Sequence, residues 1–229
     1  MPAAWDLIRQ QAQRVLIATI APPDGKVSLG WARAMASLQS PPASSTYTCL
    51  GLPFGPARNQ CLKATLELGF GYLFFVDSDV VLPGTALMTL IGAGRDVIAA
   101  EYKQRFPPFK SAHAMMVPGP NNTLNRGDLP AYPPGEIIPV DSQATGATLY
   151  SRRALESLIA KFRRPFEWGL DIAPVPGDDG QPLSPFSEDY HASTRLKAIG
   201  FQPWLHTGIV GRHEFTAVAT ATGVEMAQL

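Results

Sequence analysis

Two carboxylates one residue apart, Asp77 and Asp79, follow an apolar run of strand length. The run is Tyr72-Leu-Phe-Phe-Val76, which suits a strand buried on both faces of an α/β sheet. Acidic side chains at the end of such a strand cost free energy unless a cation or hydrogen-bond donors meet them. Mg²⁺ and Mn²⁺ often bind one or two carboxylates together with substrate phosphates, and open α/β sheets bind ligands at the carboxyl ends of their strands. The pair therefore predicts a metal-assisted site for a phosphorylated donor.

The same tripeptide, Asp77-Ser78-Asp79, is also compatible with a simple turn. In that interpretation one of the two carboxylates caps a helix that begins near Pro83 or Gly84. The tripeptide alone does not decide between the two, and its context in the chain is needed.

Composition limits the class of protein. The chain has 229 residues, enough for one sizeable α/β core, and 45% of them are hydrophobic and 17% charged, which argues against disorder. Lys plus Arg and Asp plus Glu both number 19, so there is no strong basic field that would attract nucleic acid or an anionic membrane.

Cysteine use and hydropathy indicate the compartment. Cys49 and Cys61 have no metal-ligand spacing, and we expect both to be small core residues of a reduced, cytoplasmic chain. The N-terminus lacks the pattern of a signal peptide, and no apolar run approaches the length of about 18 residues that a membrane span needs.

Hydrophobic periodicity predicts alternating strands and helices, hence a doubly wound α/β sheet. The predicted strands are 14–20, 46–50, 72–76, 96–100 and 112–117, with a further strand or turn at 140–150 and a strand plus turn at 201–213. The predicted helices are 27–38, 56–68, 84–92, 152–162 and 188–199. Residues 104–139 contain eight prolines and, with a second loop at 171–186, are expected to be functional loops.

The order of these features resembles the GT-A fold glycosyltransferases, the nucleotide-diphospho-sugar transferase family with a DxD motif. The matching pieces cover nearly the whole chain, and in order they are Ala21-Pro-Pro-Asp24, Ala57-Arg58-Asn59, Asp77-Ser-Asp79, Asp96-Val-Ile-Ala-Ala-Glu-Tyr-Lys103, Thr145-Gly146-Ala147, Ser187-Glu188-Asp189-Tyr190, and Gly200-Phe201 running into Gly211-Arg212-His213. The resemblance implies a mixed, mostly parallel Rossmann-like sheet in a single domain, residues 1–229. The nucleotide-binding part would be about 1–103 and the acceptor side about 104–229.

The resemblance also implies a metal site. Asp79 would bind Mn²⁺ or Mg²⁺, while Asp77, with Ser78 beside it, would contact the ribose or water of the metal shell. A late histidine would complete the ligand set: His213 fits best, and His206 is the second choice.

Other matched positions would bind the nucleotide and the donor sugar. The loop that holds the base would contain Thr19, Ala21, Pro22 and Asp24, although Pro-Pro-Asp-Gly forms a turn in any case. Further candidates are Arg58, Asn59, Lys103 and Gly146. The alternative roles are an ion pair for Arg58, an ordinary surface position for Lys103 and a tight turn at Gly146.

Glu188 and Asp189 would open a helix near the acceptor. The resemblance implies that Asp189 is the general base that deprotonates the acceptor hydroxyl, while Glu188 orients acceptor or donor. The alternative is that both simply compensate the helix dipole.

The function expected from the resemblance is transfer of a sugar from a nucleoside diphosphate donor, most simply UDP-linked, to an acceptor hydroxyl with inversion. The acceptor class stays open and includes a glycan, a small molecule, a protein or a modified nucleobase. Two other functions stay open: a catalytically silent nucleotide-sugar or carbohydrate-binding domain, and a nucleotidyltransferase.

Overall fold

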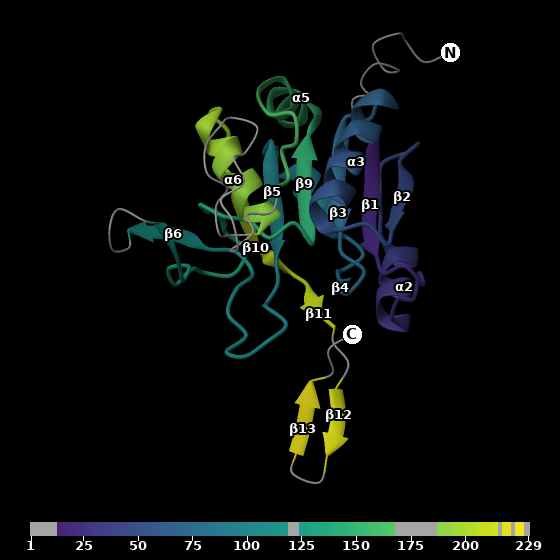
Figure 1. Cartoon of the computed structure of the whole chain (residues 1–229), viewed down its shortest axis with the longest axis vertical. Coiled ribbons are helices and arrows are strands. Elements are labelled where there is room, and N and C mark those ends of the chain that lie inside the picture. Colours follow the sequence, from purple (N-terminus) through teal and green to yellow (C-terminus); the bar gives the residue numbers. More distant parts are fainter. Residues whose placement is uncertain (1–12, 119–123, 168–186, 215–216, 221–222, 227–229) are drawn as a thin grey trace.

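The computed structural model describes residues 13–118, 124–167, 187–214, 217–220 and 223–226 (Figure 1). The loop expected at 171–186 lies outside these residues.

A seven-stranded sheet forms the centre of the molecule, with the order β2-β1-β3-β9-β5-β10-β8. Its strands, all of them labelled in Figure 1 except β8, are β1 (Val15–Ala21), β2 (Ser45–Leu50), β3 (Tyr72–Val76), β5 (Val97–Glu101), β8 (Ile137–Pro139), β9 (Ala147–Ser151) and β10 (Trp204–Val210). Five of them run parallel, whereas β9 is antiparallel to both β3 and β5, and β8 is antiparallel to β10. The predicted mixed, mostly parallel α/β sheet is confirmed.

Helices cover both faces of this sheet. They are α2 (Leu29–Ser37), α3 (Phe54–Glu67), α4 (Ala86–Gly92), α5 (Arg152–Lys161) and α6 (Glu188–Ala198). Buried residues of α3, α5 and α6 share one apolar cluster, whereas those of α4 share a second cluster with partly buried residues of α2. The strand β3 contributes to both clusters because alternate side chains of a strand point to opposite faces: Leu73 and Phe75 enter the first, Phe74 and Val76 the second. The expectation that this strand is buried on both faces is therefore confirmed.

Short strands outside the main sheet were not expected from the sequence. The pair β4 (Val80–Val81) and β11 (Arg212–His213) is antiparallel and brings the late histidine beside the Asp-x-Asp segment. The proline-rich region contains a hairpin of β6 (Met115–Pro118) and β7 (Leu124–Gly127), where a single strand at 112–117 was predicted. The hairpin of β12 (Ala217–Thr220) and β13 (Gly223–Met226) lies apart from the sheet, at the foot of Figure 1.

The two cysteines are buried in the first apolar cluster, as predicted for core residues. Their sulfur atoms are 3.6 Å apart and both thiols are free. Among the described residues, no helix is long and apolar enough to cross a membrane.

Truncation of Phe75 tests how much the apolar core contributes to stability. Its ring is fully buried and makes edge-to-face contacts with Tyr150 and Phe166 at centroid distances of 6.0 and 5.9 Å. Because truncation removes apolar contacts and leaves a cavity, we expect Phe75→Ala to lower the free energy of unfolding by about 3–5 kcal/mol. Urea unfolding followed by circular dichroism measures the change, and Phe106→Ala, at a phenylalanine that is 49% exposed, is the matched control. Equal losses in the two variants would contradict this account of the core.

Candidate active site

The Asp77-Ser78-Asp79 segment forms a turn between β3 and β4. The Asp77 amide donates to the carbonyl of Gly146 at 3.0 Å, and the Val80 amide donates to the carbonyl of Asp77 at 3.0 Å. The Trp31 indole N–H also donates to the Asp77 carbonyl, at 3.0 Å. The turn predicted by the simpler interpretation is therefore present. The helix cap is not, because α4 begins at Ala86 with Thr85 as its N-cap.

The Asp77 carboxylate is held by Arg58 of α3. Both terminal nitrogens of the guanidinium donate to Asp77, at 3.2–3.3 Å, and its Nε donates to Glu188 Oε1 at 3.0 Å. Arg58 is only 2% exposed, so a buried cation joins the end of β3 to the first turn of α6. The ion pair that was the alternative role of Arg58 thus exists, and it is made with two of the predicted site residues.

These charges shift one another's pKa values. Burial alone would lower the pKa of Arg58, but Asp77 and Glu188 outweigh it and raise that pKa. Burial raises the pKa of Glu188, and the neighbouring charge of Asp189 adds to the effect, while Arg58 opposes it. Burial also raises the pKa of Asp189, against the Ser187 hydroxyl and Arg58, which lower it. The pair of carboxylates at the start of α6 therefore accepts protons more readily than in water.

Asp79 lies beside His213. The distance from His213 Nε2 to Asp79 Oδ2 is 3.2 Å, and His213 Nδ1 lies 3.0 Å from the carbonyl oxygen of Lys103. Because a carbonyl only accepts, Nδ1 carries the proton of the neutral ring and Nε2 presents its lone pair to Asp79. Burial lowers the pKa of His213, which favours this neutral form. The carboxylate and the ring nitrogen thus face each other as two acceptors, and the Arg105 guanidinium provides positive charge at the same carboxylate oxygen.

The chemistry and spacing of this pair fit a divalent ion. Ligand atoms about 2.1 Å from an octahedral ion, at right angles to each other, lie about 3 Å apart. A hydrogen bond from the second ring nitrogen to a carbonyl is the usual way in which metal-binding histidines are oriented. Within the described ranges, however, no three His, Cys, Asp or Glu side chains are grouped closely enough to hold a metal. The pair therefore suits an ion that takes its remaining ligands from substrate phosphates and water, as Mg²⁺ commonly does.

Arg105 is a site residue that the sequence reasoning missed. Its guanidinium contacts the Asp79 carboxylate, on the oxygen that also faces His213. The available signal was the pair of basic residues in Lys103-Gln104-Arg105, directly after β5. Glu214 was also missed: its amide donates to the Asp79 carbonyl at 2.7 Å, and its carboxylate accepts from Ser28.

Gly146 lies against the Asp77 carboxylate. A Cβ atom at this position would be 2.7 Å from the Tyr102 hydroxyl and 2.9 Å from Asp77 Oδ2, closer than real contacts allow. Its amide donates to the Tyr102 hydroxyl at 3.0 Å. A glycine is therefore required here because the backbone packs closely against Tyr102 and Asp77. The role of Gly146 toward a donor sugar stays a prediction, and Tyr102 is a further residue that the sequence reasoning did not single out.

Asp189 begins α6 together with Glu188. Its Oδ1 accepts from the Tyr190 amide at 2.8 Å and from the Ser187 hydroxyl. The Tyr190 hydroxyl donates to the carbonyl of Ala112 at 2.7 Å, which links this turn to the segment that follows β5. The structure thus joins Glu188 to Asp77 through Arg58, and Asp189 is the next residue in the same turn of α6.

The remaining predicted nucleotide contacts are less closely connected to this centre. Thr19 and Ala21 are buried at the end of β1, and Pro22 accepts from the Gly25 amide at 2.9 Å in an exposed turn. In that turn, Asp24 pairs with Lys26 at 2.9 Å. The nucleotide-binding role of this loop stays a prediction.

Asn59, Lys103 and His206 have structural partners of their own. The Asn59 side chain donates to the Phe166 carbonyl at 2.6 Å and accepts from the Phe166 amide at 3.1 Å. Lys103 Nζ is 3.1 Å from Glu101 Oε1. His206 lies within β10, where Nδ1 accepts from the Gly208 amide at 3.2 Å. Of the two late histidines, the structure places His213 beside Asp79.

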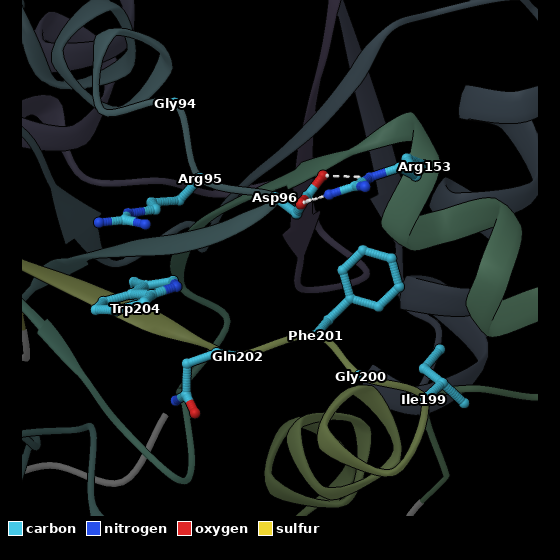
Figure 2. Close-up of a pocket in the computed structure, with 9 residues that line it drawn as sticks. All are labelled: Gly94, Arg95, Asp96, Arg153, Ile199, Gly200, Phe201, Gln202 and Trp204. Carbon is cyan, nitrogen blue, oxygen red and sulfur yellow. Dashed lines mark hydrogen bonds and ion pairs between the residues drawn. The ribbon is translucent and has the colours of Figure 1, made fainter.

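A pocket lies at the edge of the sheet opposite to Asp77 and Asp79 (Figure 2). Its volume is about 370 Å³, and it opens at the amino ends of β5 and β10. The Arg95 guanidinium lies over the Trp204 ring at 4.1 Å, and Arg153 pairs with Asp96, as Figure 2 shows. None of the predicted site residues lines this pocket. Asp77, Asp79 and the residues around them lie at the other edge of the sheet, where the parallel strands end.

Comparisons with other proteins give a likeness in structure only. The chain matches no family profile and no curated protein sequence. A crystal structure of A197 from STIV has a TM-score of 0.58 and 15% identity, over 94% of this chain and 94% of that one. A structure of GalNAc-T7 with UDP, GalNAc and Mn²⁺ has a TM-score of 0.55 and 9% identity. That match covers 88% of this chain but only 44% of GalNAc-T7.

The chain has a GT-A-like fold. In this fold the Asp-x-Asp segment follows a central strand at the carboxyl edge of the sheet, where Arg58, Gly146, His213 and the first turn of α6 meet it. At these identities the likeness concerns the fold, and the roles of individual residues rest on the geometry described above.

Arg58→Met tests the buried cation. We expect a loss of about 3–5 kcal/mol in the free energy of unfolding, because Asp77 and Glu188 lose the charge that balances them. Without the guanidinium, the pKa of Glu188 rises further above its unfolded value. A carboxyl shifted in this direction binds more protons when folded, so stability falls as pH increases between the two pKa values.

The loss should therefore be larger at about pH 8 than at about pH 5, measured by urea unfolding at each pH. Lys63→Met is the control, since it removes one charge of the exposed Lys63–Glu67 pair. An Arg58→Met loss that does not change with pH would show that Glu188 is not the group left unbalanced.

Proposed function

We propose that this protein is a divalent-metal-dependent glycosyltransferase that moves a sugar from a nucleoside diphosphate donor to an acceptor hydroxyl. The observation that carries the proposal is the pair of Asp79 and His213, with Nε2 of the histidine 3.2 Å from the carboxylate and Nδ1 held by the Lys103 carbonyl. The GT-A-like fold supports it, because the pair lies at the carboxyl edge of the sheet where such folds bind ligands.

The donor proposed is UDP-linked, with Mn²⁺ or Mg²⁺ as the ion. GalNAc-T7, whose structure contains UDP and Mn²⁺, supports this choice through its fold. When bound, the metal would neutralise charge on the leaving diphosphate, which is worth several kcal/mol in such reactions. Asp79 and His213 would hold it.

The other residues have positioning roles in this proposal. Arg58 fixes the Asp77 carboxylate at the edge of the site, and the Gly146 backbone, packed against that carboxylate, would contact the donor sugar. Lys103 and Arg105 would add positive charge beside the diphosphate. Residues 1–103 would form the nucleotide-binding part and residues 104–229 the acceptor side.

Asp189 is the proposed general base of an inverting displacement. Its carboxylate would take the proton of the acceptor hydroxyl while that oxygen bonds to the anomeric carbon and the diphosphate leaves from the opposite face. The raised pKa of Asp189 suits this role, because a base works best when its pKa approaches the working pH. Glu188, bound to Arg58, would orient the base and its substrate.

Thermal unfolding with nucleoside diphosphates tests the donor site. Wild-type protein with UDP and Mn²⁺ at about 100 times Kd should gain about 2.7 kcal/mol of stability. For a chain of this size that is a shift in Tm of roughly 2–4 °C per kcal/mol. We expect Asp79→Asn and His213→Gln to lose the shift, since each removes one metal ligand.

His206→Gln is the matched control and should keep the shift. GDP, CDP and dTDP, each with and without Mn²⁺, identify the base preference. If no diphosphate produces a metal-dependent shift, the donor site is wrong. If His206→Gln loses the shift and His213→Gln keeps it, the ligand assignment is wrong.

Asp189→Asn tests the base. We expect donor binding to be kept and turnover to fall by about 10²–10⁴, the usual contribution of general base catalysis. Hydrolysis of UDP-sugar is measured first, because the acceptor is not yet identified, and the NMR signal of the anomeric proton reports inversion or retention. Wild-type binding without metal-dependent hydrolysis or transfer would instead favour a catalytically silent nucleotide-sugar-binding domain.

A further inference from the structure

Arg105 occupies the carboxylate that the proposed metal site needs. Its guanidinium contacts Asp79 Oδ2, the oxygen that also lies 3.2 Å from His213 Nε2. The side chains of Arg105 and Asp79 are 32% and 27% exposed, so their contact can break and re-form without opening the apolar core. A lone pair that a divalent ion would take from this oxygen is therefore already engaged by a cation of the chain itself.

The segment that carries Arg105 is pinned at its base. Lys103 and Ser111 form an antiparallel bridge, and the Gln104 amide donates to the carbonyl of Lys110 at 2.8 Å. Arg105 is the first residue beyond these contacts on the side of β5. Its backbone therefore stays beside the site while its long side chain can change partner.

The neighbouring carboxylates offer Arg105 no second partner. Asp77 is held by Arg58 at 3.2 Å, and Glu101 Oε1 lies 3.1 Å from Lys103 Nζ. A guanidinium that leaves its carboxylate would therefore need a new anion. The substrate diphosphate is the anion that the proposed function supplies at this edge of the sheet.

Charge balance favours the same exchange. Asp79 and Arg105 neutralise each other in the structure. A divalent ion added here by itself would leave an excess of positive charge beside Arg105, whereas the ion together with a dianionic diphosphate would leave none. Repulsion between like charges disfavours the first state. A guanidinium also binds two phosphate oxygens at once, which favours the second state.

We propose that Arg105 is a placeholder for the metal: it neutralises Asp79 when the donor is absent and moves to the donor diphosphate when ion and nucleotide bind together. This deepens the proposed function and rests on it. Ion and nucleotide then bind synergistically, because each removes a cost of binding the other. Arg105 would thereby prevent the site from holding an ion that carries no substrate.

Binding of Mn²⁺ alone tests the first half of this exchange. Free Mn²⁺ is measured by electron paramagnetic resonance in a titration of the full chain without nucleotide. We expect Arg105→Gln to bind Mn²⁺ about tenfold more tightly than wild type, since this variant has no guanidinium to displace. The double variant Arg105→Gln, Asp79→Asn should lose the gain, because the gain depends on the Asp79 carboxylate.

Binding of UDP at saturating Mn²⁺ tests the second half. By isothermal titration calorimetry, Arg105→Gln should bind UDP about tenfold more weakly than wild type, because the diphosphate loses a charged partner. This change is opposite in direction to the effect on the ion alone, whereas a merely structural role would change both affinities in the same direction. Arg105→Lys keeps the charge and should bring both affinities back toward those of wild type.

Lys110→Gln is the matched control. It removes an exposed cation of the same segment, one that pairs with Asp128 at 2.7 Å, and should leave both affinities unchanged. An unchanged Mn²⁺ affinity in Arg105→Gln would overturn the placeholder. So would changes of equal size in Arg105→Gln and Lys110→Gln, or a change of both affinities in one direction.

Failure of this exchange is distinguishable from failure of the proposed function. If wild type binds UDP with Mn²⁺ and Arg105→Gln has the same two affinities, only the placeholder is refuted. If Arg105→Gln shows the two opposite changes but wild type neither hydrolyses nor transfers a sugar, the placeholder stands and the enzyme is refuted. If none of the proteins binds Mn²⁺, both are refuted.

Discussion

The buried guanidinium of Arg58 is the interaction on which the candidate site depends. It joins three segments that are far apart in sequence: α3, the end of β3 and the start of α6. A cation that is 2% exposed is tolerated only because two carboxylates neutralise it, and those carboxylates are tolerated at this depth because of the cation. The contact fixes the distance between the side that would hold the donor and the turn that would hold the base.

The fold was predictable from sequence to the extent that its signals are local. The strand ending at Val76, the helices on either side of it and the mostly parallel sheet follow from periodicity within single segments. The insertion of β9 between β3 and β5 and the pairing of β4 with β11 are non-local. A two-residue strand such as Arg212–His213 has no periodicity to detect, and only its partner in space defines it.

The same limit applies to the site. Asp77, Asp79 and Glu188 were recognised because a carboxylate at the end of a buried strand or the start of a helix stands out in the sequence. Their partners were less visible. From the sequence, Arg105 would be taken for an exposed basic residue in a proline-rich stretch. Its contact with Asp79 depends on the path of the chain after β5, which the sequence does not reveal. The family resemblance ranked His213 above His206 only by its place in the order of motifs. The β4–β11 pair adds a spatial reason, because it places His213 opposite Val80, next to the Asp-x-Asp turn.

Tyr102 connects the two halves of the proposed site. Its ring makes edge-to-face contacts with His113 and with His213, at centroid distances of 5.4 and 5.7 Å, and its hydroxyl accepts from the Gly146 amide. One buried side chain therefore packs against the histidine of the proposed metal site and against a second, buried histidine while it holds the glycine beside Asp77. Both imidazoles are oriented by backbone carbonyls, of Lys103 and of Ala100. Because these two carbonyls flank Tyr102 in the sequence, the geometry around Asp77 and Asp79 depends on a few residues of backbone at the end of β5 and directly after it.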